Sequence, residues 1–428
     1  MMDHFDSMTG GSKVIVVGAG FAGLTAVRAL RRVRVEVLLL DSHNYHTFTP
    51  LLYQVASALL DPSEVAHPIR SIVRRIHNLE TRLATVTGVD LEGRGVRTDN
   101  GMVHYDHLFL AAGSVNNYFG IKGLEETSFG LKEMDQAMLL RNRVLAAFEQ
   151  AVWESDPEVR QTLLTFAVVG GGPTGVEFAG ALSELIHGVL RKDFGNLNTA
   201  SSRILLIEAR DSLLANFDRG LRESARHALE RKGIEVMLGS VVRTAHEPLI
   251  ELEDGTTIGA GTIIWTAGVR ANPLASAIGA ETGRGGGLRV LPTLQLPGHP
   301  EVFVIGDLAY LEQDGRALPQ LIPVAMQQAR HAVRNLERIG RGEPPRAFRY
   351  RDPGIMATIG RNAGVAELGP LKMGGFNGWL LWLGFHLLQI VSFRSKLVVL
   401  VNWAWNYLFY DRPVRLLLGD MRRPRRPR

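Results

Sequence analysis

The chain of 428 residues contains no cysteine. Without thiols it cannot form a disulfide, a thiolate metal site or a redox-active dithiol pair. This absence excludes the thiol–disulfide reductases and the sulfide-oxidising enzymes that work through cysteine. No group of histidines and carboxylates stands at metal-ligand spacing either, so we expect no metal site.

Targeting and spanning segments are also missing. Residues 1–12 lack the basic and then apolar pattern of a signal peptide, so we expect the catalytic domains to stay in the cytoplasm. The apolar runs near the C-terminus are shorter than the roughly 20 residues that span a bilayer as a helix. The basic charge forms no long stripe, so we expect no nucleic-acid partner. With 46% hydrophobic and 21% charged residues the chain is not disordered, and its length allows two or three domains.

The sequence does contain two glycine-rich loops, at residues 18–23 and 170–175. Each follows a short apolar run, 13–17 or 165–169, that predicts a buried parallel strand. Each precedes a helical pattern whose free N–H groups and positive dipole end favour a phosphate. The glycines serve the sharp turn, the approach of a pyrophosphate and the packing of helix on strand. They are Gly18, Gly20 and Gly23 in the first loop and Gly170, Gly172 and Gly175 in the second. Two such loops predict a chain that holds two dinucleotides and passes electrons between them.

An acidic residue ends the strand that follows each loop. Asp41 closes the run 35–40, and Glu208 closes the run 203–207. At this position a carboxylate accepts hydrogen bonds from an adenosine ribose. Glu208 would also repel the 2′-phosphate of NADP, which favours NAD, although Arg210 weakens that preference.

Residues 340–428 differ in character from the rest. Two apolar segments, Trp379–Phe393 and Leu397–Tyr410, hold four of the six tryptophans, and residues 421–428 carry five arginines. Tryptophan and tyrosine prefer the lipid–water boundary, and arginines attract anionic lipid. We predict a monotopic pair of helices lying in one leaflet of an anionic membrane surface. The alternative for the helices is a buried hairpin or a dimer interface. The alternative for the arginine tail is a disordered, solvated end.

Several segments together resemble one family. They are the two glycine loops, the Gly-Val-Glu continuation of the second loop, the run Ile264–Arg270, the element Val304–Asp307 and the aromatic C-terminal pair. Over residues 13–418 the chain resembles the type II NADH:quinone oxidoreductases, the single-subunit, non-proton-pumping NADH dehydrogenases of respiratory membranes. The resemblance implies an α/β fold with two Rossmann-like dinucleotide-binding domains, as in glutathione reductase, and a C-terminal membrane-anchoring helical region.

The implied domains follow the order of the motifs. Residues 1–115 would form the first part of the FAD-binding domain, and 116–285 an inserted NADH-binding domain with its helical linker. Residues 286–340 would complete the FAD-binding domain, and 341–428 would be the membrane-associated region. The strand-Gly-Asp element at 302–307 suggests this return of the chain to its first domain.

The resemblance also assigns roles to residues. The loop Phe48–Leu52 resembles the flavin-contacting loop. The residues expected to bind FAD are Gly18, Gly20, Gly23, Asp41, Pro50, Leu51, Ala112, Gly113 and Asp307. The residues expected to bind NADH are Gly170, Gly172, Gly175, Glu208 and Gly268. Glu177 matches an acidic residue near the nicotinamide, and its alternative role is to stabilise the first turn of its own helix.

The chain departs from the family at the quinone site. The family often carries Ala-Gln-x-x-x-Gln there, on a helix under the flavin ring, and the matching stretch here is 322–327. Pro323 replaces the first glutamine, and Gln327, with Gln328 beside it, provides the second. Proline has no side-chain donor and suits a helix start. We expect the first quinone contact to be lost or moved to Gln327, a backbone N–H or water. Pro323, Gln327 and Gln328 are the quinone-site candidates, and Glu177 and Gln327 the catalytic ones.

The expected activity is a non-electrogenic NADH:quinone oxidoreductase that uses FAD. The protein would be peripheral and monotopic on the cytoplasmic face of the cell membrane. One alternative is a reductase of a small soluble electron-transfer protein on the same fold. Another is a nucleotide-responsive FAD- and NADH-binding protein that signals through dimerisation. The quinone type, the strictness of NADH over NADPH and a homodimer stay open.

Overall fold

A computed structural model describes residues 11–412 and 414–417. The arginine tail predicted to meet the membrane, 421–428, therefore lies outside the described residues. The chain divides into two compact units. Unit 1 comprises residues up to His46, 67–115 and 269–352, and unit 2 comprises residues 47–66, 116–268 and those from Pro353 onward.

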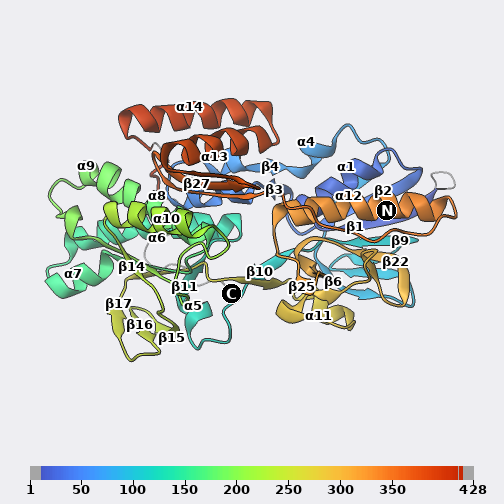
Figure 1. The fold of residues 1–428 in the computed structure, drawn as a ribbon, viewed down its shortest axis with the longest axis horizontal. Helices are drawn as coiled ribbons and strands as arrows, with labels where there is room; N and C mark the ends of the chain where they lie inside the picture. The colour runs from blue at the N-terminus through green and yellow to red at the C-terminus, as the bar shows by residue number, and fades with distance from the viewer. Residues whose placement is uncertain (1–10, 413, 418–428) are drawn as a thin grey trace. The chain divides into compact units, whose positions relative to one another are not determined.

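The sheet of unit 1 has the strand order β21-β22-β9-β1-β2-β5, with all neighbours parallel except β21 and β22 (Figure 1). Its first strand is buried on both faces because every residue from Val14 to Val17 is apolar. Val14 and Val16 join one core cluster, and Ile15 and Val17 join the other. The bounds are β1 Ser12–Val17, β2 Val35–Asp41, β5 Leu79–Leu83, β9 His107–Leu110, β21 Gln295–Leu296 and β22 His299–Val304.

Helices α1 (Phe21–Leu30) and α12 (Ile322–Gly340) pack together on one face of this sheet. The antiparallel strands β6 (Val86–Asp90), β7 (Gly95–Thr98) and β8 (Gly101–His104) contribute to the core on the other face. The smaller elements of unit 1 are α4 Ile69–Val73, β19 Val269–Ala271, α11 Leu274–Ile278, η4 Arg284–Gly286, β20 Leu288–Arg289, η5 Gly306–Leu308, β23 Ala309–Tyr310, β24 Glu312–Gln313 and β25 Arg316–Ala317. Short strands at the sequence bounds of the units are β3 Tyr45–Thr47, β4 Ala66–Pro68 and β10 Ser114–Asn116.

Unit 2 repeats the plan with a parallel sheet in the order β11-β18-β12-β13-β14. Its strands are β11 Ser128–Gly130, β12 Thr165–Val169, β13 Arg203–Ile207, β14 Ile234–Met237 and β18 Thr262–Trp265. The antiparallel strands are β15 Val242–His246, β16 Leu249–Leu252 and β17 Thr257–Gly259. The helices are η1 Thr49–Leu51, α2 Leu52–Ala56, α3 Pro62–Val65, α5 Leu124–Thr127, α6 Met134–Trp153, α7 Pro157–Leu163, α8 Pro173–Glu184, the π-helix η2 Leu185–Leu190, α9 Arg191–Asp193, η3 Thr199–Ser201 and α10 Arg219–Arg231.

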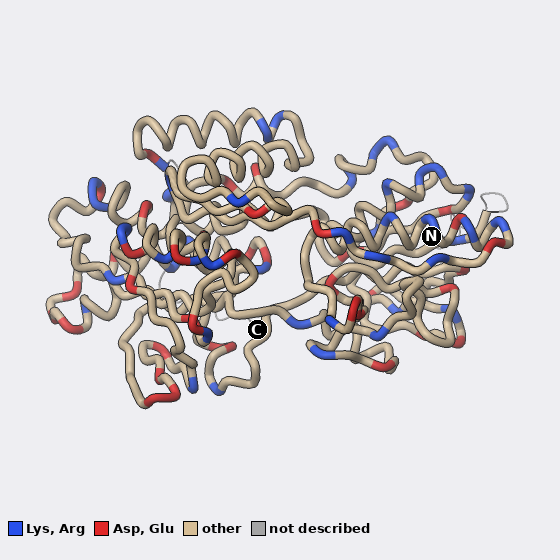
Figure 2. Tube along the Cα trace, in the orientation of Figure 1, with Lys and Arg blue, Asp and Glu red and all other residues tan. Residues whose placement is uncertain are grey.

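The C-terminal part of unit 2 is a small sheet covered by two helices. Strands β26 (Ile355–Gly360), β27 (Ala363–Leu368) and β28 (Leu371–Gly374) pair antiparallel, and β26 packs on α8. Helix α13 (Gly375–Gln389) packs on β27, and α14 (Phe393–Phe409) lies outside α13 (Figure 1). Figure 2 shows both helices almost without charge, with Lys and Arg only near the start of α14, where Arg394 and Lys396 stand.

The fold class expected from the sequence is confirmed: two parallel α/β sheets, each with a glycine loop after a central strand, and a pair of helices at residues 375–409. Within the described ranges, 11–412 and 414–417, no helix is both long and apolar enough to cross a membrane. The predicted bound at 115 coincides with a bound of the contact-defined units, whereas the predicted bounds at 285 and 340 do not. Packing also places residues 47–66 with α8 and residues 269–285 with the first sheet.

Candidate functional site

The first glycine loop can be built only from glycine at two of its three positions. Gly18 has φ +98°, and a Cβ there would lie 2.4 Å from the carbonyl oxygen of Ala111. A Cβ on Gly23 would lie 1.8 Å from the carbonyl oxygen of Gly18. A Cβ on Gly20 would meet nothing within 4 Å. The loop therefore combines a tight turn with open space at Gly20, where helix α1 begins without a side-chain cap, as suits the binding of a pyrophosphate.

Asp41 is tied to this loop by two backbone hydrogen bonds. Its carboxylate accepts from Ala19 N at 2.5 Å through Oδ2 and from His43 N at 2.7 Å through Oδ1. Burial raises the pKa of Asp41, while these two donors act in the opposite direction. His46, which no pattern in the sequence singled out, supports the same turn, since its Nδ1 lies 2.9 Å from the carbonyl oxygen of Ala19. The carboxylate thus stands beside the loop, at the position expected of a ribose acceptor.

Asp307 lies where β22 ends, in the same unit. Its Oδ2 accepts from Ser114 Oγ at 2.5 Å, just after the turn formed by Ala112 and Gly113, which has φ +72°. The preceding Gly306 also has φ +72°, and its N–H donates to Oε1 of the buried Gln328 at 2.7 Å. The strand-Gly-Asp element and the 112–114 turn are therefore joined by side-chain contacts that fix the Asp307 carboxylate.

The quinone-site candidates separate into different environments on α12. Pro323 occupies the first turn of α12, as its missing N–H favours. Gln328 is buried against Gly306, as described. The side-chain amide of Gln327 bonds the backbone of Arg351. Its Nε2 donates to the carbonyl oxygen at 2.8 Å, and its Oε1 accepts from the N–H at 3.1 Å. Both glutamine side chains already have partners within unit 1.

The second loop has the same geometry as the first. Gly170 has φ +116°, and a Cβ there would lie 2.7 Å from Ala267 Cα. A Cβ on Gly175 would lie 1.9 Å from the carbonyl oxygen of Gly170, whereas one on Gly172 would meet nothing within 4 Å. The open glycine again lies at the start of a helix, α8, which has no side-chain cap on its first N–H groups.

Glu208 repeats the role of Asp41. Its Oε2 accepts from Gly171 N at 2.5 Å, and its Oε1 accepts from Arg210 N at 2.9 Å. Near this loop, Gly268 has φ +157° at the end of the Trp-Thr-Ala-Gly run. Thr266 Oγ1 donates to the carbonyl oxygen of Val169 at 2.9 Å, which holds that run against the loop strand. Each unit therefore carries one glycine loop with one carboxylate bonded to its backbone.

Glu177 is buried in unit 2, with 8% of its surface exposed. Its Oε1 accepts from the backbone N–H of Thr358 at 3.2 Å and from Trp382 Nε1 at 3.0 Å. Burial raises the pKa of Glu177 to about 8. The first turn of α8 contains no acidic residue, so the alternative role of Glu177 as a first-turn stabiliser does not fit its position. A carboxyl group with a pKa near neutrality can both donate and accept a proton.

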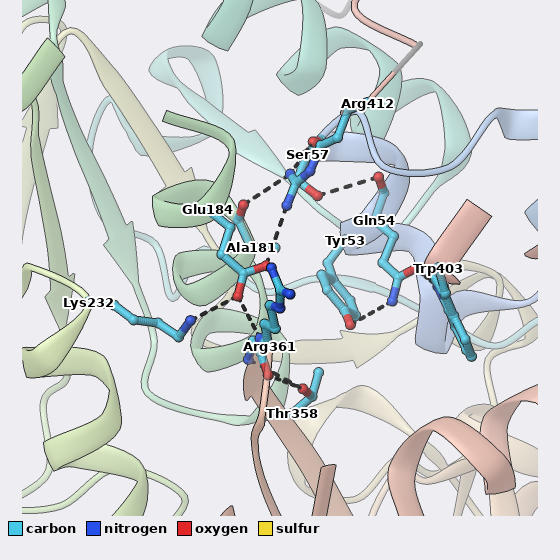
Figure 3. A network of polar contacts seen from close by, with 11 residues as sticks. Tyr53, Gln54, Ser57, Ala181, Glu184, Lys232, Thr358, Arg361, Trp403 and Arg412 are labelled. Atoms are coloured by element: carbon cyan, nitrogen blue, oxygen red, sulfur yellow. Dashed lines mark hydrogen bonds and ion pairs between the residues drawn. The ribbon is translucent and has the colours of Figure 1, made fainter. Parts of the chain in front are cut away.

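An aromatic and amide cluster surrounds this carboxyl group. Tyr53 OH accepts from Gln54 Nε2 at 2.8 Å, and Gln54 Oε1 accepts from Trp403 Nε1 at 2.8 Å (Figure 3). The Tyr53 ring packs edge-on to Trp382, with centroids 6.2 Å apart. The predicted flavin-contacting residues Pro50 and Leu51 form η1, directly before these residues in unit 2. No sequence pattern indicated that these residues form a cluster, because they come from distant segments of the chain.

The residues present fit two dinucleotides. Each loop offers an open glycine, a helix start and a neighbouring carboxylate, the set that a pyrophosphate and an adenosine ribose need. In the part of the chain that the structure describes, no group of three or more His, Asp or Glu side chains could hold a metal ion.

Comparisons with known proteins agree with this geometry. A family model described as pyridine nucleotide-disulphide oxidoreductase matches residues 12–329. The type II NADH:quinone oxidoreductase Ndh of Mycobacterium tuberculosis is 37% identical, over 92% of this chain and 88% of its own length. The internal alternative NAD(P)H-ubiquinone oxidoreductase A1 of Arabidopsis thaliana is 30% identical, over 93% of this chain and 84% of its own.

A solved structure shares the fold. The structure of NDH2 from Plasmodium falciparum in complex with NADH has a TM-score of 0.87, with 19% identity, and covers 95% of this chain and 100% of that one. The chain therefore belongs to the pyridine nucleotide-disulphide oxidoreductases and, among them, to the type II NADH:quinone oxidoreductases that the sequence motifs resemble.

Proposed function

We propose that this protein is a FAD-dependent enzyme that transfers two electrons from NADH to a membrane quinone without pumping protons. The observation that carries the proposal is the 37% identity to a type II NADH:quinone oxidoreductase over 92% of the chain. The two loop–carboxylate pairs and the absence of cysteine support it, since they provide two dinucleotide sites and leave no dithiol route for the electrons.

The roles of the two units follow from their loops. We assign FAD to the first loop and NADH to the second, with Asp41 and Glu208 accepting from the adenosine riboses. Asp307 would bond the ribityl chain of FAD, and Ser114 holds its carboxylate in place. FAD, when bound, supplies the redox centre that takes two electrons from NADH and yields them to the acceptor. The protein contributes binding and orientation. The domain bounds 1–115, 116–285, 286–340 and 341–428 stay a prediction.

Quinone reduction takes up protons as well as electrons, and a buried carboxyl group with a pKa near neutrality can relay protons. We assign this role to Glu177, because burial brings the pKa of this carboxyl group to about 8. Gln327 and Pro323 remain the proposed quinone-side residues on α12. The amide nitrogen of Gln327 carries two N–H donors, and its contact to the Arg351 carbonyl oxygen uses one of them. Gln328 acts in this proposal as a support for Gly306.

The C-terminal helices are the proposed membrane-binding surface. Large apolar side chains on α13 and α14 are exposed, among them Leu388, Phe393 and Leu408, at 74%, 74% and 68%. Together with Trp405, half exposed, they form a surface suited to the lipid–water boundary. We propose that the protein is peripheral and monotopic on the cytoplasmic face of the membrane, with the arginine tail near anionic lipid. A homodimer stays a prediction.

Anaerobic stopped-flow absorbance with purified full-length protein tests the function. NADH should bleach the flavin rapidly and NADPH more slowly, and ubiquinone or menaquinone analogues should restore the flavin colour. A flavin that NADH does not bleach would contradict the proposal. Reoxidation by a soluble electron-transfer protein and not by quinones would favour the alternative reductase. Quinone turnover slower than about one per second would favour a nucleotide-responsive binding protein.

A further inference from the structure

Glu177 obtains its hydrogen bonds from the C-terminal part of unit 2. One donor is the backbone N–H of Thr358 on β26, and the other is the indole N–H of Trp382 on α13, 205 positions away in the sequence. The backbone donor is independent of side-chain identity. The indole donor depends on one residue, and that residue lies on a helix proposed to touch the membrane.

Trp382 is held firmly in its position. It is 1% exposed, and its ring stacks on His386 with centroids 4.2 Å apart and an interplanar angle of 29°. His386 Nδ1 lies 2.8 Å from the backbone carbonyl oxygen of Trp382, so ring and backbone of this turn are tied together. The rings of Tyr53 and Trp403 pack on Trp382 from α2 and α14, at 6.2 and 6.0 Å. The indole therefore cannot rotate away from Glu177 without disturbing three helices.

The same helix carries apolar side chains on its outer surface. Leu380, Phe385 and Leu388 on α13 are exposed, whereas Trp382 and His386 face inward. Helix α13 thus presents apolar atoms to the outside and an N–H donor to a buried carboxyl group within about two turns. Any shift of α13 changes the distance between Trp382 Nε1 and Glu177 Oε1.

We propose that Trp382 is a positioning residue whose indole N–H holds the Glu177 carboxylate. Through this hydrogen bond, the position of α13 affects proton transfer at Glu177. The role of Glu177 in this step rests on the proposed function. The hydrogen bond itself does not, so the two ideas can fail separately.

The groups around Glu177 leave the indole as the donor that a substitution can remove. On α8, Glu184 is paired with Lys232 and Arg412. On α2, the pKa of Tyr53 is raised by burial and next by Glu177 itself. On α13, burial lowers the pKa of His386 to about 4, so its ring is neutral near pH 7 and adds no charge to the stack. The neighbouring positive charges have other partners. Lys232 bonds Glu184, and Arg361 and Arg412 donate to backbone oxygens.

A donor to the ionised form of a carboxyl group lowers its pKa, and removing that donor raises it. Trp382→Phe keeps an aromatic ring for the stack on His386 and deletes the N–H. We expect the pKa of Glu177 to rise by about one unit in this variant, since one unit is the scale of a single charged hydrogen bond. The matched control is Trp405→Phe, which removes an indole N–H of α14 that lies 3.5 Å from Asp411.

The test uses full-length, FAD-loaded protein and infrared difference spectroscopy across pH, with Glu177→Gln to identify the carboxyl band. Trp382→Phe should move the titration of that band upward by about one unit and move the pH profile of kcat with it. The KM for NADH should stay unchanged, and Trp405→Phe should leave the band in place. A folded Trp382→Phe protein with an unmoved band would overturn the proposal. If the band moves while Glu177→Gln retains full quinone turnover, the positioning stands and the proposed role of Glu177 fails.

A second replacement covers the case in which phenylalanine leaves a gap and the variant does not fold. Benzothienylalanine at position 382 keeps the shape of tryptophan and replaces the N–H by sulfur. The same upward shift of the Glu177 band is expected. An unchanged titration in this protein would show that the indole N–H does not control the carboxyl group.

Discussion

Arg412 Nη2 lies 3.5 Å from Glu184 Oε2, and this pair fastens the segment after α14 to helix α8 (Figure 3). The Arg412 guanidinium is 1% exposed, and its Nη1 also donates to the carbonyl oxygens of Ser57 at 2.7 Å and Ala181 at 3.1 Å. Burial lowers the pKa of Arg412 to about 10, so the group stays charged at neutral pH. One side chain thus joins the segment after α14 to α2 and α8.

Replacing this arginine should destabilise unit 2. Arg412→Met would delete the ion pair and both backbone contacts while filling much of the space, and we expect a loss of about 3 kcal/mol, the scale of a broken buried pair. Urea unfolding of the purified protein measures it. Arg394→Met, on an exposed arginine at the start of α14, is the control and should change little. Equal stability of the two variants would contradict the role of Arg412.

The two loop carboxylates should affect different ligands. Glu208→Ser would remove the acceptor for Gly171 N and Arg210 N, and we expect the KM for NADH to rise by about tenfold, since a charged hydrogen bond contributes roughly 1.5–3 kcal/mol. Flavin content should stay normal. Asp41→Ser is the matched variant and should instead lower the flavin retained on purification. Steady-state kinetics and flavin absorbance measure both effects, and an unchanged KM together with lost flavin in Glu208→Ser would reverse the assignment of the loops.

Glu177 should make the protein less stable as pH rises. Its folded pKa of about 8 lies above the ordinary value of 4.5, so the unfolded chain loses the proton first between these pH values. Stability from this group is therefore fully present below about pH 4.5 and is lost as pH rises toward 8. We expect Glu177→Gln to be more stable than the parent by a few kcal/mol at pH 8 and equal to it near pH 4.5. Thermal unfolding of both proteins across this pH range measures their difference in stability. A difference that is the same at all pH values would argue against a raised pKa.

Polar substitution on the C-terminal helices should weaken membrane binding. Leu388→Ser, Phe393→Ser and Leu408→Ser together remove three of the most exposed apolar side chains of α13 and α14. We expect the triple variant to remain in the supernatant when vesicles of mixed neutral and anionic lipid are sedimented. Its NADH-driven dye reduction should be retained. Leu249→Ser, at an exposed position of β16, is the control. If the triple variant still binds vesicles in full, the membrane-binding surface of the protein lies elsewhere.

Much of the dinucleotide architecture could be predicted because it depends on short segments. The strands before Gly18 and Gly170 are buried on both faces, so their apolar runs are continuous, and the helices after them follow without a break. Asp41 and Glu208 end the next strand, and parallel pairing brings them to their loop automatically. The two C-terminal helices could be predicted from their long apolar segments, although each helix begins several residues earlier than the predicted segment.

The environments of the polar site residues could not be predicted in the same way. Gln327 and Gln328 are adjacent in the sequence, yet one bonds the backbone of Arg351 and the other bonds Gly306, because neighbouring residues on a helix point about 100° apart. Trp379 and Trp382 belong to one aromatic run, and only the packing of α13 shows that Trp382 is the one that meets Glu177. His46 and Arg412 carried no local signal at all.

The sequence by itself determined that this protein has two dinucleotide-binding units, an acidic residue beside each loop and no thiol chemistry, because strand burial, turn geometry and composition are properties of short segments. Only the tertiary structure decided that Glu177 is buried with its pKa raised to about 8 and that Trp382 donates to it. Glu177 and Trp382 stand 205 positions apart, and their contact depends on how β26 and α13 pack on α8, a result of the whole fold of unit 2.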